Sequence, residues 1–366
     1  MKVADWRARD EGWSPDVSRL QAALWCRQPD RVPLAELKVD DTVKAAFLGL
    51  DQWPADRRGA MAADVEFARA AGYDAVRATA QVDYGATGHK KRHHYSANTE
   101  AEQERTWQQL GLGPIRALDD VEAYPWPDPE AADVTDLELA SELAPPGMGI
   151  ITALKGGGIF ERAWYLMGFE GFMTATVENP ELVAVTMERA GRVWYEVARR
   201  CLGFPRVSVL WFSDDLAYTE GFMVNPSIYR AHLFPWIERL GDLCRRRMPP
   251  VPLVFHSDGK LWDVLGDLMA CGVNGLHPIE PKAMDIVEVK RRVQGRMCVI
   301  GNIDLGYTLT RGTPAEVEAE VRERIRTVGP GGGYCLGSSN SVTDYVPVAN
   351  FAAMARSCLR YGRYPL

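Results

Sequence analysis

The sequence contains no stretch of about 18 consecutive apolar residues, so no membrane-spanning helix is expected. Its first ten residues also lack the apolar segment of a secretory signal. The seven cysteines form an odd set without a Cys-x-x-Cys pair, which argues against a disulfide framework and against a zinc knuckle. We therefore expect a cytoplasmic protein in which most cysteines are small buried side chains.

Basic residues are too few for a surface that binds polyanions. Lysine and arginine number 42 against 49 aspartates and glutamates, which gives a net charge of −7. Nucleic acid is therefore not an expected partner. With 46% hydrophobic and 25% charged residues, the chain can bury a large core, which excludes wholesale disorder. A length of 366 residues admits two small domains or one large α/β barrel.

Eight short apolar runs alternate with longer helical stretches, and each run is predicted to be a strand. They cover residues 32–37, 73–79, 149–154, 207–212, 252–255, 273–277, 297–300 and 333–336. The later runs are almost continuously apolar, as in parallel strands covered by helices. Helix starts are marked by Asn179-Pro180, Asn225-Pro226 and Thr313-Pro314. The pattern predicts one (β/α)8 TIM barrel over residues 1–366, with a helical extension over 1–30 and an insertion over 81–146 after the second strand.

Catalytic residues of such barrels lie at the carboxyl ends of the strands. His256 and Asp258, two residues apart after the fifth strand, point to the same face of an extended chain. They could ligate a metal, or act as a base with its orienting acid; alternatively Asp258 caps a helix and His256 is a core residue. Asp214 and Asp215 end the fourth strand. Their adjacent carboxylates need a cation or a shared proton, and at most one of them faces the barrel axis.

Further polar side chains follow the sixth, seventh and eighth strands. Glu280 stands between two prolines and could be a ligand or a base, whereas Asn302 offers an amide or simply forms a turn. The candidate contacts for an anionic substrate are Arg31, Arg77, Lys155, Ser339 and Asn340. The basic run at residues 90–94, within the predicted insertion, is either a solvated surface or an electrostatic funnel.

Read together, these motifs resemble those of the uroporphyrinogen decarboxylase superfamily, which contains the decarboxylase of haem biosynthesis and the corrinoid- and thiol-linked methyltransferases. The resemblance covers nearly the whole chain. It rests on the order and spacing of motifs at residues 27–33, 71–74, 168–170, 215–217, 256–259, 301–304 and 347–351. Membership would imply an enzyme with a TIM-barrel fold that pairs as a homodimer.

Two departures from the patterns of this superfamily bear on function. The decarboxylases bind substrate carboxylates through an arginine-rich loop ending in Gly-Arg-Tyr, which residues 30–34 do not reproduce. The thiol-activating methyltransferases bind zinc through His-x-Cys at the fifth strand and a second cysteine after the eighth, and Asp258 and Asn340 stand at those cysteine positions here. The resemblance thus implies either an oxygen-rich site of His256, Asp258 and Glu280 for a divalent metal, with zinc as the first guess, or a site without metal.

We favour a methyltransferase-like enzyme that moves a methyl group from a small oxygenated substrate to a thiol or to a corrinoid carried by a partner protein. Its predicted catalytic residues are Asp214, Asp215, His256 and Asn302. The alternative is a metal-free decarboxylase that acts on a carboxylate-bearing substrate through Asp215 and His256. A ligand-binding barrel without catalytic activity is the third hypothesis.

Overall fold

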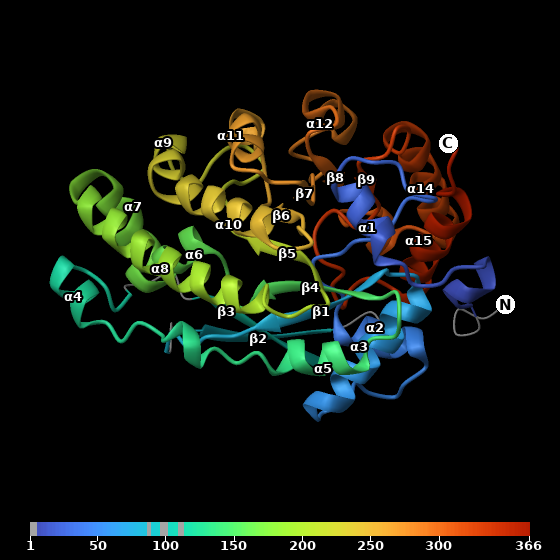
Figure 1. The fold of residues 1–366 in the computed structure, drawn as a ribbon, viewed down its shortest axis with the longest axis horizontal. Coiled ribbons are helices and arrows are strands. Elements are labelled where there is room, and N and C mark those ends of the chain that lie inside the picture. The colour runs from blue at the N-terminus through green and yellow to red at the C-terminus, as the bar shows by residue number, and fades with distance from the viewer. Residues whose placement is uncertain (1–5, 86–88, 96–101, 109–112) are drawn as a thin grey trace.

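The computed structural model describes residues 6–85, 89–95, 102–108 and 113–366, the two short ranges without their side chains. Its centre is a curled sheet of seven parallel strands surrounded by helices (Figure 1). In their order across the sheet, the strands are β1 (Ala75–Ala80), β4 (Gly149–Leu154), β5 (Val207–Ser213), β6 (Leu253–His256), β7 (Gly275–His277), β8 (Cys298–Ile300) and β9 (Tyr334–Cys335).

Seven of the eight predicted strands are thereby confirmed, with bounds displaced by at most two residues. The prediction of a strand at residues 32–37 is wrong. This segment lies beside β9 and forms one parallel bridge, between Leu34 and Leu336. In the part of the chain that the structure describes, no ladder joins it to β1. Pro33 has no amide hydrogen, and the side facing β1 is separated from that strand by a cavity, so the segment makes sheet bonds on one side only.

Helices cover the outer face of the sheet, and α3, α8, α10 and α12 contact β1, β4, β6 and β8 in turn. The helices are α1 (Val17–Leu24), α2 (Asp41–Leu48), α3 (Arg57–Ala71), α4 (Leu118–Ala123), α5 (Thr135–Leu143), α6 (Ile159–Met167), α7 (Phe169–Glu178), α8 (Pro180–Cys201), α9 (Pro226–Ile228), α10 (Phe234–Arg246), α11 (Leu265–Ala270), α12 (Ile286–Val293), α13 (Thr308–Arg311), α14 (Pro314–Val328) and α15 (Val348–Tyr361). Short 3-10 turns occur at Ala8–Glu11, Pro129–Ala131 and Trp262–Val264, and a π turn at Tyr229–Leu233.

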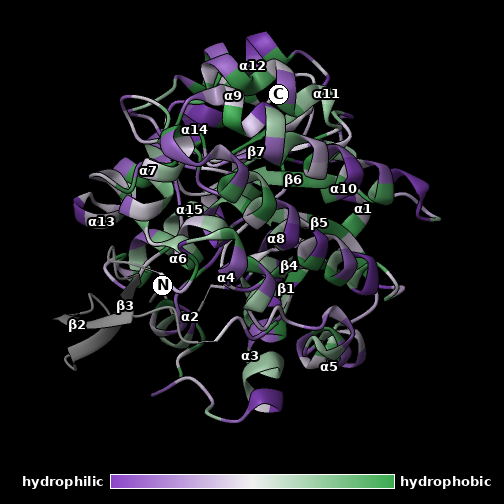
Figure 2. Ribbon diagram, turned by 90° about the vertical axis from the view of Figure 1, so that its left-hand side faces the viewer, coloured by the Kyte–Doolittle hydropathy of each residue, from purple (hydrophilic) through white to green (hydrophobic). Residues whose placement is uncertain are grey.

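The predicted helix starts are confirmed, because α8, α9 and α14 each begin at a proline that follows a capping side chain. Asn179 caps α8, and Thr313 forms a capping box with Glu316 at the start of α14. The hydropathy colouring in Figure 2 shows hydrophilic residues along the outer helices and hydrophobic residues on the strands between them. The apolar faces of the helices therefore pack on the sheet.

The inside of the curl holds a small apolar cluster that α1 closes at the amino end of the sheet. Leu20 and Leu24 of α1 pack there with Val209, Val254 and Cys335. All seven cysteines are free, and six of them are buried, as expected of small apolar side chains. None of the helices in the described ranges has the length and apolar character needed to cross a bilayer.

Between β1 and β4 the chain forms the antiparallel pair β2 (His89–Tyr95) and β3 (Glu102–Gln108), followed by α4 and α5. A bridge between Gln81 and Asp133 joins the two ends of this stretch. The insertion over 81–146 and the extension over 1–30 stay predictions. The side chains of the basic run at 90–94 lie outside the described residues.

Candidate active site

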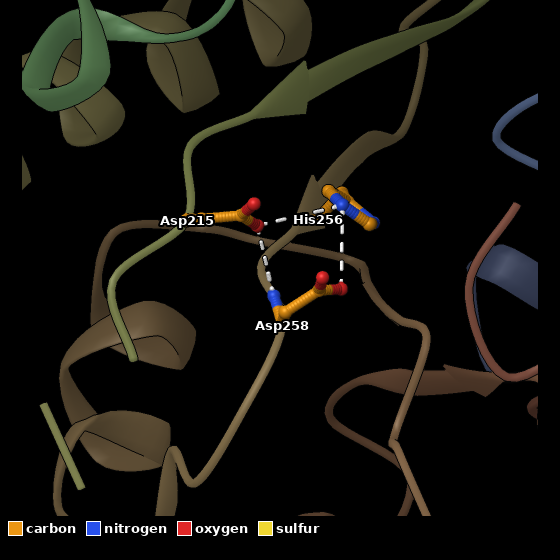
Figure 3. Close-up of side chains that lie close together, drawn as sticks. All are labelled: Asp215, His256 and Asp258. Atoms are coloured by element: carbon orange, nitrogen blue, oxygen red, sulfur yellow. Dashed lines mark hydrogen bonds and ion pairs between the residues drawn. The ribbon is translucent and has the colours of Figure 1, made fainter. Parts of the chain in front are cut away.

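Three side chains meet at the carboxyl ends of β5 and β6, and Figure 3 shows them pointing toward one another. His256 ends β6, while Asp215 and Asp258 follow β5 and β6 by two residues each. The Nε2 atom of His256 lies 3.5 Å from Oδ1 of Asp215 and 3.7 Å from Oδ1 of Asp258. One possible ligand atom from each residue lies within 4.8 Å of the others. We call these three residues the carboxylate–histidine cluster.

Hydrogen bonds hold both carboxylates of the cluster, one from the backbone and one from a side chain. The amide of Asp258 donates a hydrogen bond of 3.0 Å to Oδ1 of Asp215. On its other side, Asn340 donates from Nδ2 to Oδ2 of Asp258 over 2.7 Å. The structure therefore brings together Asp215, His256, Asp258 and Asn340, all of which were predicted site residues. They come from three separate stretches of the chain.

His256 is held from behind by a second buried imidazole. His277, the residue in register with it on β7, places its Nδ1 atom 2.7 Å from Nδ1 of His256. Burial lowers the pKa of His256 despite the nearby Asp215, and burial together with His256 and Arg77 holds the pKa of His277 well below its usual range. Both rings are therefore neutral at pH 7, and one proton lies between the two Nδ1 atoms.

Asp258 favours its protonated form when no cation is bound. Burial, with Asp215 and Glu280 nearby, raises the pKa of Asp258 to about 8. Its Oδ1 atom is buried and has no hydrogen-bond partner in the described residues. A buried carboxylate oxygen without a partner, next to a second carboxylate and an imidazole nitrogen, is the donor set of a divalent cation that accepts nitrogen and oxygen ligands.

Glu280 was predicted as a metal ligand, but it is not in the cluster. Its Oε2 atom accepts a 2.9 Å hydrogen bond from the amide of Gly259, and burial raises its pKa. Asp215 takes the place in the cluster that the sequence assigned to Glu280. Glu280 thus acts on the site through its charge on Asp258.

Asp214 turns away from the cluster and caps helix α6. Its two carboxylate oxygens accept hydrogen bonds of 2.8 Å from the amides of Ile159, Phe160 and Glu161. Burial raises the pKa of Asp214 to about 7, although these three amides favour the charged form. This confirms that only one of the two adjacent aspartates faces the site. Asp214 is a positioning residue for the loop that follows β4.

Asn302 and Ser339 hold loops rather than face the cluster. Asn302 donates to the carbonyl of Ile279 over 2.7 Å and accepts from Arg324 over 3.0 Å. The hydroxyl of Ser339 accepts from the amide of Leu305 over 3.0 Å. Both side chains form hydrogen bonds within the protein. For Asn302 this agrees with the interpretation that it forms a turn.

The three predicted cationic contacts lie in two places. Arg31 is at the amino end of the sheet, where Asp30 and Asp74 offset its charge, so it is remote from the cluster. Arg77 and Lys155 line a cavity of about 900 Å³ between β1 and the segment that contains Glu36. Ser213 also lines this cavity and pairs in register with His256.

Two residues near the site were missed or left open at the sequence level. His277 was not assigned to the site, because nothing in the sequence shows that β6 and β7 place the two histidines in register. Glu161 was not considered; it lies near Asp215 and its pKa is raised well above the usual range by burial and that neighbour. The sequence feature that could have indicated Glu161 is the run Gly156-Gly157-Gly158. A helix begins after this run, and a glutamate three residues after Gly158 can accept a hydrogen bond from the Gly158 amide and so cap that helix.

The sequence matches a known family. The sequence profile described as uroporphyrinogen decarboxylase (URO-D) matches residues 113–361. The chain is 30% identical over 220 residues to "Methylcobamide:CoM methyltransferase MtaA" of Methanosarcina barkeri, which is 60% of each protein. It is 23% identical over 137 residues to uroporphyrinogen decarboxylase of Legionella pneumophila, which is 37% of each. The chain therefore spans less than two thirds of the length of either relative.

A solved structure extends the likeness to almost the whole fold. The methyltransferase from Methanosarcina mazei superposes with a TM-score of 0.68 at 18% identity, over 97% of this chain and 98% of that one. At this identity the match shows a shared fold. Together with the profile match, which covers more than half of the sequence, it leads to one assignment: the chain belongs to the uroporphyrinogen decarboxylase (URO-D) family.

Proposed function

We propose that the protein is a methyltransferase that moves a methyl group from a small oxygenated substrate to a corrinoid or thiol acceptor, using a divalent cation at the carboxylate–histidine cluster. The observation that carries this is the close approach of Asp215, His256 and Asp258. Within this cluster, Oδ1 of Asp258 is buried and has no hydrogen-bond partner in the described residues. The methyltransferase among the relatives supports the reaction class. A corrinoid protein as partner, a homodimer and a cytoplasmic location belong to the same proposal.

The donor set favours zinc or another divalent ion that accepts oxygen ligands. His256 would contribute Nε2, and Asp215 and Asp258 one carboxylate oxygen each. When bound, such an ion would act as a Lewis acid on a substrate oxygen. A metal ion bound by two carboxylates is a harder Lewis acid than one bound by two thiolates. The carboxylate ligands therefore suit a substrate that binds through oxygen.

Neighbouring side chains hold the metal ligands in place and can supply a proton. His277 fixes the ring of His256, and Asn340 holds one oxygen of Asp258 so that the other stays free. An oxygen that loses its methyl group must take up a proton. Glu161, whose raised pKa keeps it protonated at neutral pH, lies near Asp215 and is the candidate donor.

Metal uptake tests the proposal most directly. After loading with zinc and gel filtration, wild-type protein should retain about one equivalent per chain, whereas His256→Ala and Asp258→Asn should retain little. Glu280→Gln is the matched control, because Glu280 is a nearby half-buried carboxylate whose oxygen accepts from the Gly259 amide and which lies outside the cluster. The loaded enzyme should then methylate cob(I)alamin from a methoxy compound such as anisole, which absorbance follows. Failure of the wild type to hold metal, or equal loss in Glu280→Gln, would contradict the assignment.

A metal-free decarboxylase is the second candidate, and the pKa of Asp258, raised to about 8, favours it. A protonated Asp258 beside His256 could deliver a proton to the carbon that loses CO2. The Legionella relative is a decarboxylase by name. This alternative predicts release of CO2 from a carboxylate-bearing substrate by protein treated with a chelator, with activity lost in Asp258→Asn.

A further inference from the structure

Arg77 is a half-buried cation without a counter-ion in the described residues. It lies on β1, and no residue in the described ranges forms a hydrogen bond or an ion pair with its guanidinium. Its Nη1 atom is shielded from solvent and has no partner. Burial alone lowers the pKa of Arg77 to about 10, with no carboxylate to oppose it. Since a partly buried charge without a partner is destabilising, an anion from outside the chain would stabilise Arg77 by pairing with it.

Five cations and five carboxyl groups line the cavity beside Arg77, and three of the cations have no ion pair with a described residue. Lys38 and Lys155 line it, and neither has an ion pair with any residue that the structure describes. The other two cations of its wall are neutralised, Lys44 by Asp41 and Asp64, and Arg57 by Asp133 and Asp136. Three unpaired cations therefore face a space of about 900 Å³.

The wall of the cavity is also partly apolar, since Trp53, Met61 and Phe67 line it. A space of this size exceeds the volume of a small inorganic anion and suits a molecule with an apolar body. Arginine presents a planar fork that matches a carboxylate, which lysine cannot do. We propose that this cavity is a binding site for a small carboxylic acid with an apolar body, whose carboxylate pairs with Arg77 and is attracted by Lys38 and Lys155.

The position of Arg77 connects this site to the carboxylate–histidine cluster. Its Cζ atom lies 5.9 Å from the centre of the Trp211 ring, and that ring lies 5.2 Å from the ring of His277. Ser213, which lines the cavity, is in register with His256. A carboxylate at Arg77 would thus place the rest of the molecule along β5 toward Asp215. The inference deepens the proposed function by naming the substrate class, but the binding site itself rests on Arg77 and the cavity.

The test compares the binding of benzoate with that of benzyl alcohol, a neutral molecule of the same shape, by calorimetry at constant ionic strength. Wild-type protein should bind benzoate more tightly than benzyl alcohol. Benzenesulfonate and inorganic phosphate separate a carboxylate site from a general anion site, and tighter binding of either would overturn the assignment to a carboxylic acid. Arg77→Met should weaken benzoate binding roughly tenfold or more, because a charge-assisted pair is lost.

Arg58→Met is the matched control, because it removes a nearby cation of the same helix whose partner, Glu142, does not line the cavity, so that no carboxylate of the wall loses its partner. It should leave benzoate affinity within about twofold of the wild type. Arg77→Met without ligand should melt at or above the wild-type temperature, because it removes a half-buried cation that has no ion pair in the described residues. If it does not fold, Arg77→Lys keeps the charge but loses the fork and should bind benzoate more weakly than the wild type. Unchanged affinity in the folded Arg77 variant, or equal binding of benzoate and benzyl alcohol, would overturn the inference.

Metal uptake distinguishes failure of this inference from failure of the proposed function. Arg77→Met should keep its zinc, and His256→Ala should lose zinc while it still binds benzoate. If His256→Ala loses benzoate binding and Arg77→Met keeps it, the carboxylate binds at the cluster. That result would overturn the site at Arg77.

Discussion

The Nδ1 atoms of His256 and His277 lie 2.7 Å apart, so each imidazole fixes the tautomer of the other. If Nε2 of His256 is to bind a cation, its Nδ1 must carry the hydrogen and donate it to Nδ1 of His277. His277 then carries its hydrogen on Nε2, an atom without a partner in the described part of the chain. A cation at the cluster therefore selects one of the two tautomers of this pair.

The His256–His277 contact predicts how metal affinity responds to substitution. His277→Phe removes the acceptor for Nδ1 of His256 and should weaken zinc binding by roughly 10- to 100-fold. His277→Asn places an amide oxygen near the position of Nδ1 and should restore most of the affinity. Competition with a chromophoric chelator measures both. His232→Phe, which removes a half-exposed histidine elsewhere in the fold, is the control.

Thermal unfolding of the same variants separates positioning from packing. The unpartnered Nε2 of His277 means that His277→Phe removes an unsatisfied buried group as well as a hydrogen bond, so the melting temperature should change little. Weaker zinc binding that accompanies a large fall in melting temperature, or that His277→Asn fails to rescue, would contradict the positioning role.

The sheet was predictable because its strands are nearly continuous apolar runs. Residues 149–154 and 207–212 can only be buried, and they form β4 and β5 within one residue of the expected bounds. The segment at 32–37 is also mostly apolar, although it contains Pro33 and Glu36, and it did not form a strand. Pairing on both sides of a strand depends on neighbours that are distant in the sequence, and here the neighbour on one side is a cavity.

The candidate site was predictable where a local rule applied. His256 and Asp258 share a face because they are two residues apart, and this put both in the cluster. The same rule could not decide which of Asp214 and Asp215 faces inward, nor that Glu280 turns to the Gly259 amide. Those outcomes depend on where the start of α6 and the loop after β6 lie in space, which sequence spacing does not encode.

The capping role of Asp214 predicts a stability effect without loss of metal. Asp214→Asn replaces one acceptor oxygen by an NH2 group that faces the amides at the start of α6, so the free energy of unfolding should fall by about 1–3 kcal/mol. Urea denaturation measures this. Zinc stoichiometry should stay at the wild-type value; a variant of unchanged stability that cannot bind metal would instead place Asp214 among the ligands.

A buried ion pair at the amino end of the sheet should be more costly to break. Nη1 of Arg19 lies 2.5 Å from Oδ1 of Asp74, and both side chains are less than a tenth exposed. Arg19→Met leaves Asp74 buried without its partner and should cost about 3–5 kcal/mol in the free energy of unfolding. The double variant Arg19→Met with Asp74→Asn should recover most of that loss, because the new side-chain carbonyl is uncharged and can still accept from the Asp16 amide. Additive losses in the double variant would show that the pair does not act as a unit.

A buried glutamate at the other end of the sheet lies against Ser338. The hydroxyl of Ser338 lies 2.7 Å from Oε2 of Glu36 and 3.0 Å from the carbonyl of Asn340. The backbone amide of Ser338 also donates to Oε1 of Glu36 over 2.7 Å. Burial raises the pKa of Glu36 from 4.5 to about 8, although the two hydrogen bonds from Ser338 favour the charged form.

The state of Glu36 fixes the sign of a pH effect on stability. Between pH 4.5 and 8 the folded protein holds a proton on Glu36 that the unfolded chain has released, so the contribution of this group to the free energy of unfolding falls as pH rises through that window. Glu36→Gln mimics the protonated form, since its amide can donate to Ser338, and it does not titrate. The free energy of unfolding of the variant should therefore rise relative to that of the wild type as pH rises, by up to about 1.4 kcal/mol per pH unit. Urea denaturation of both proteins at several values between pH 5 and 8 measures the difference, and a difference independent of pH would show that Glu36 is charged in the folded protein.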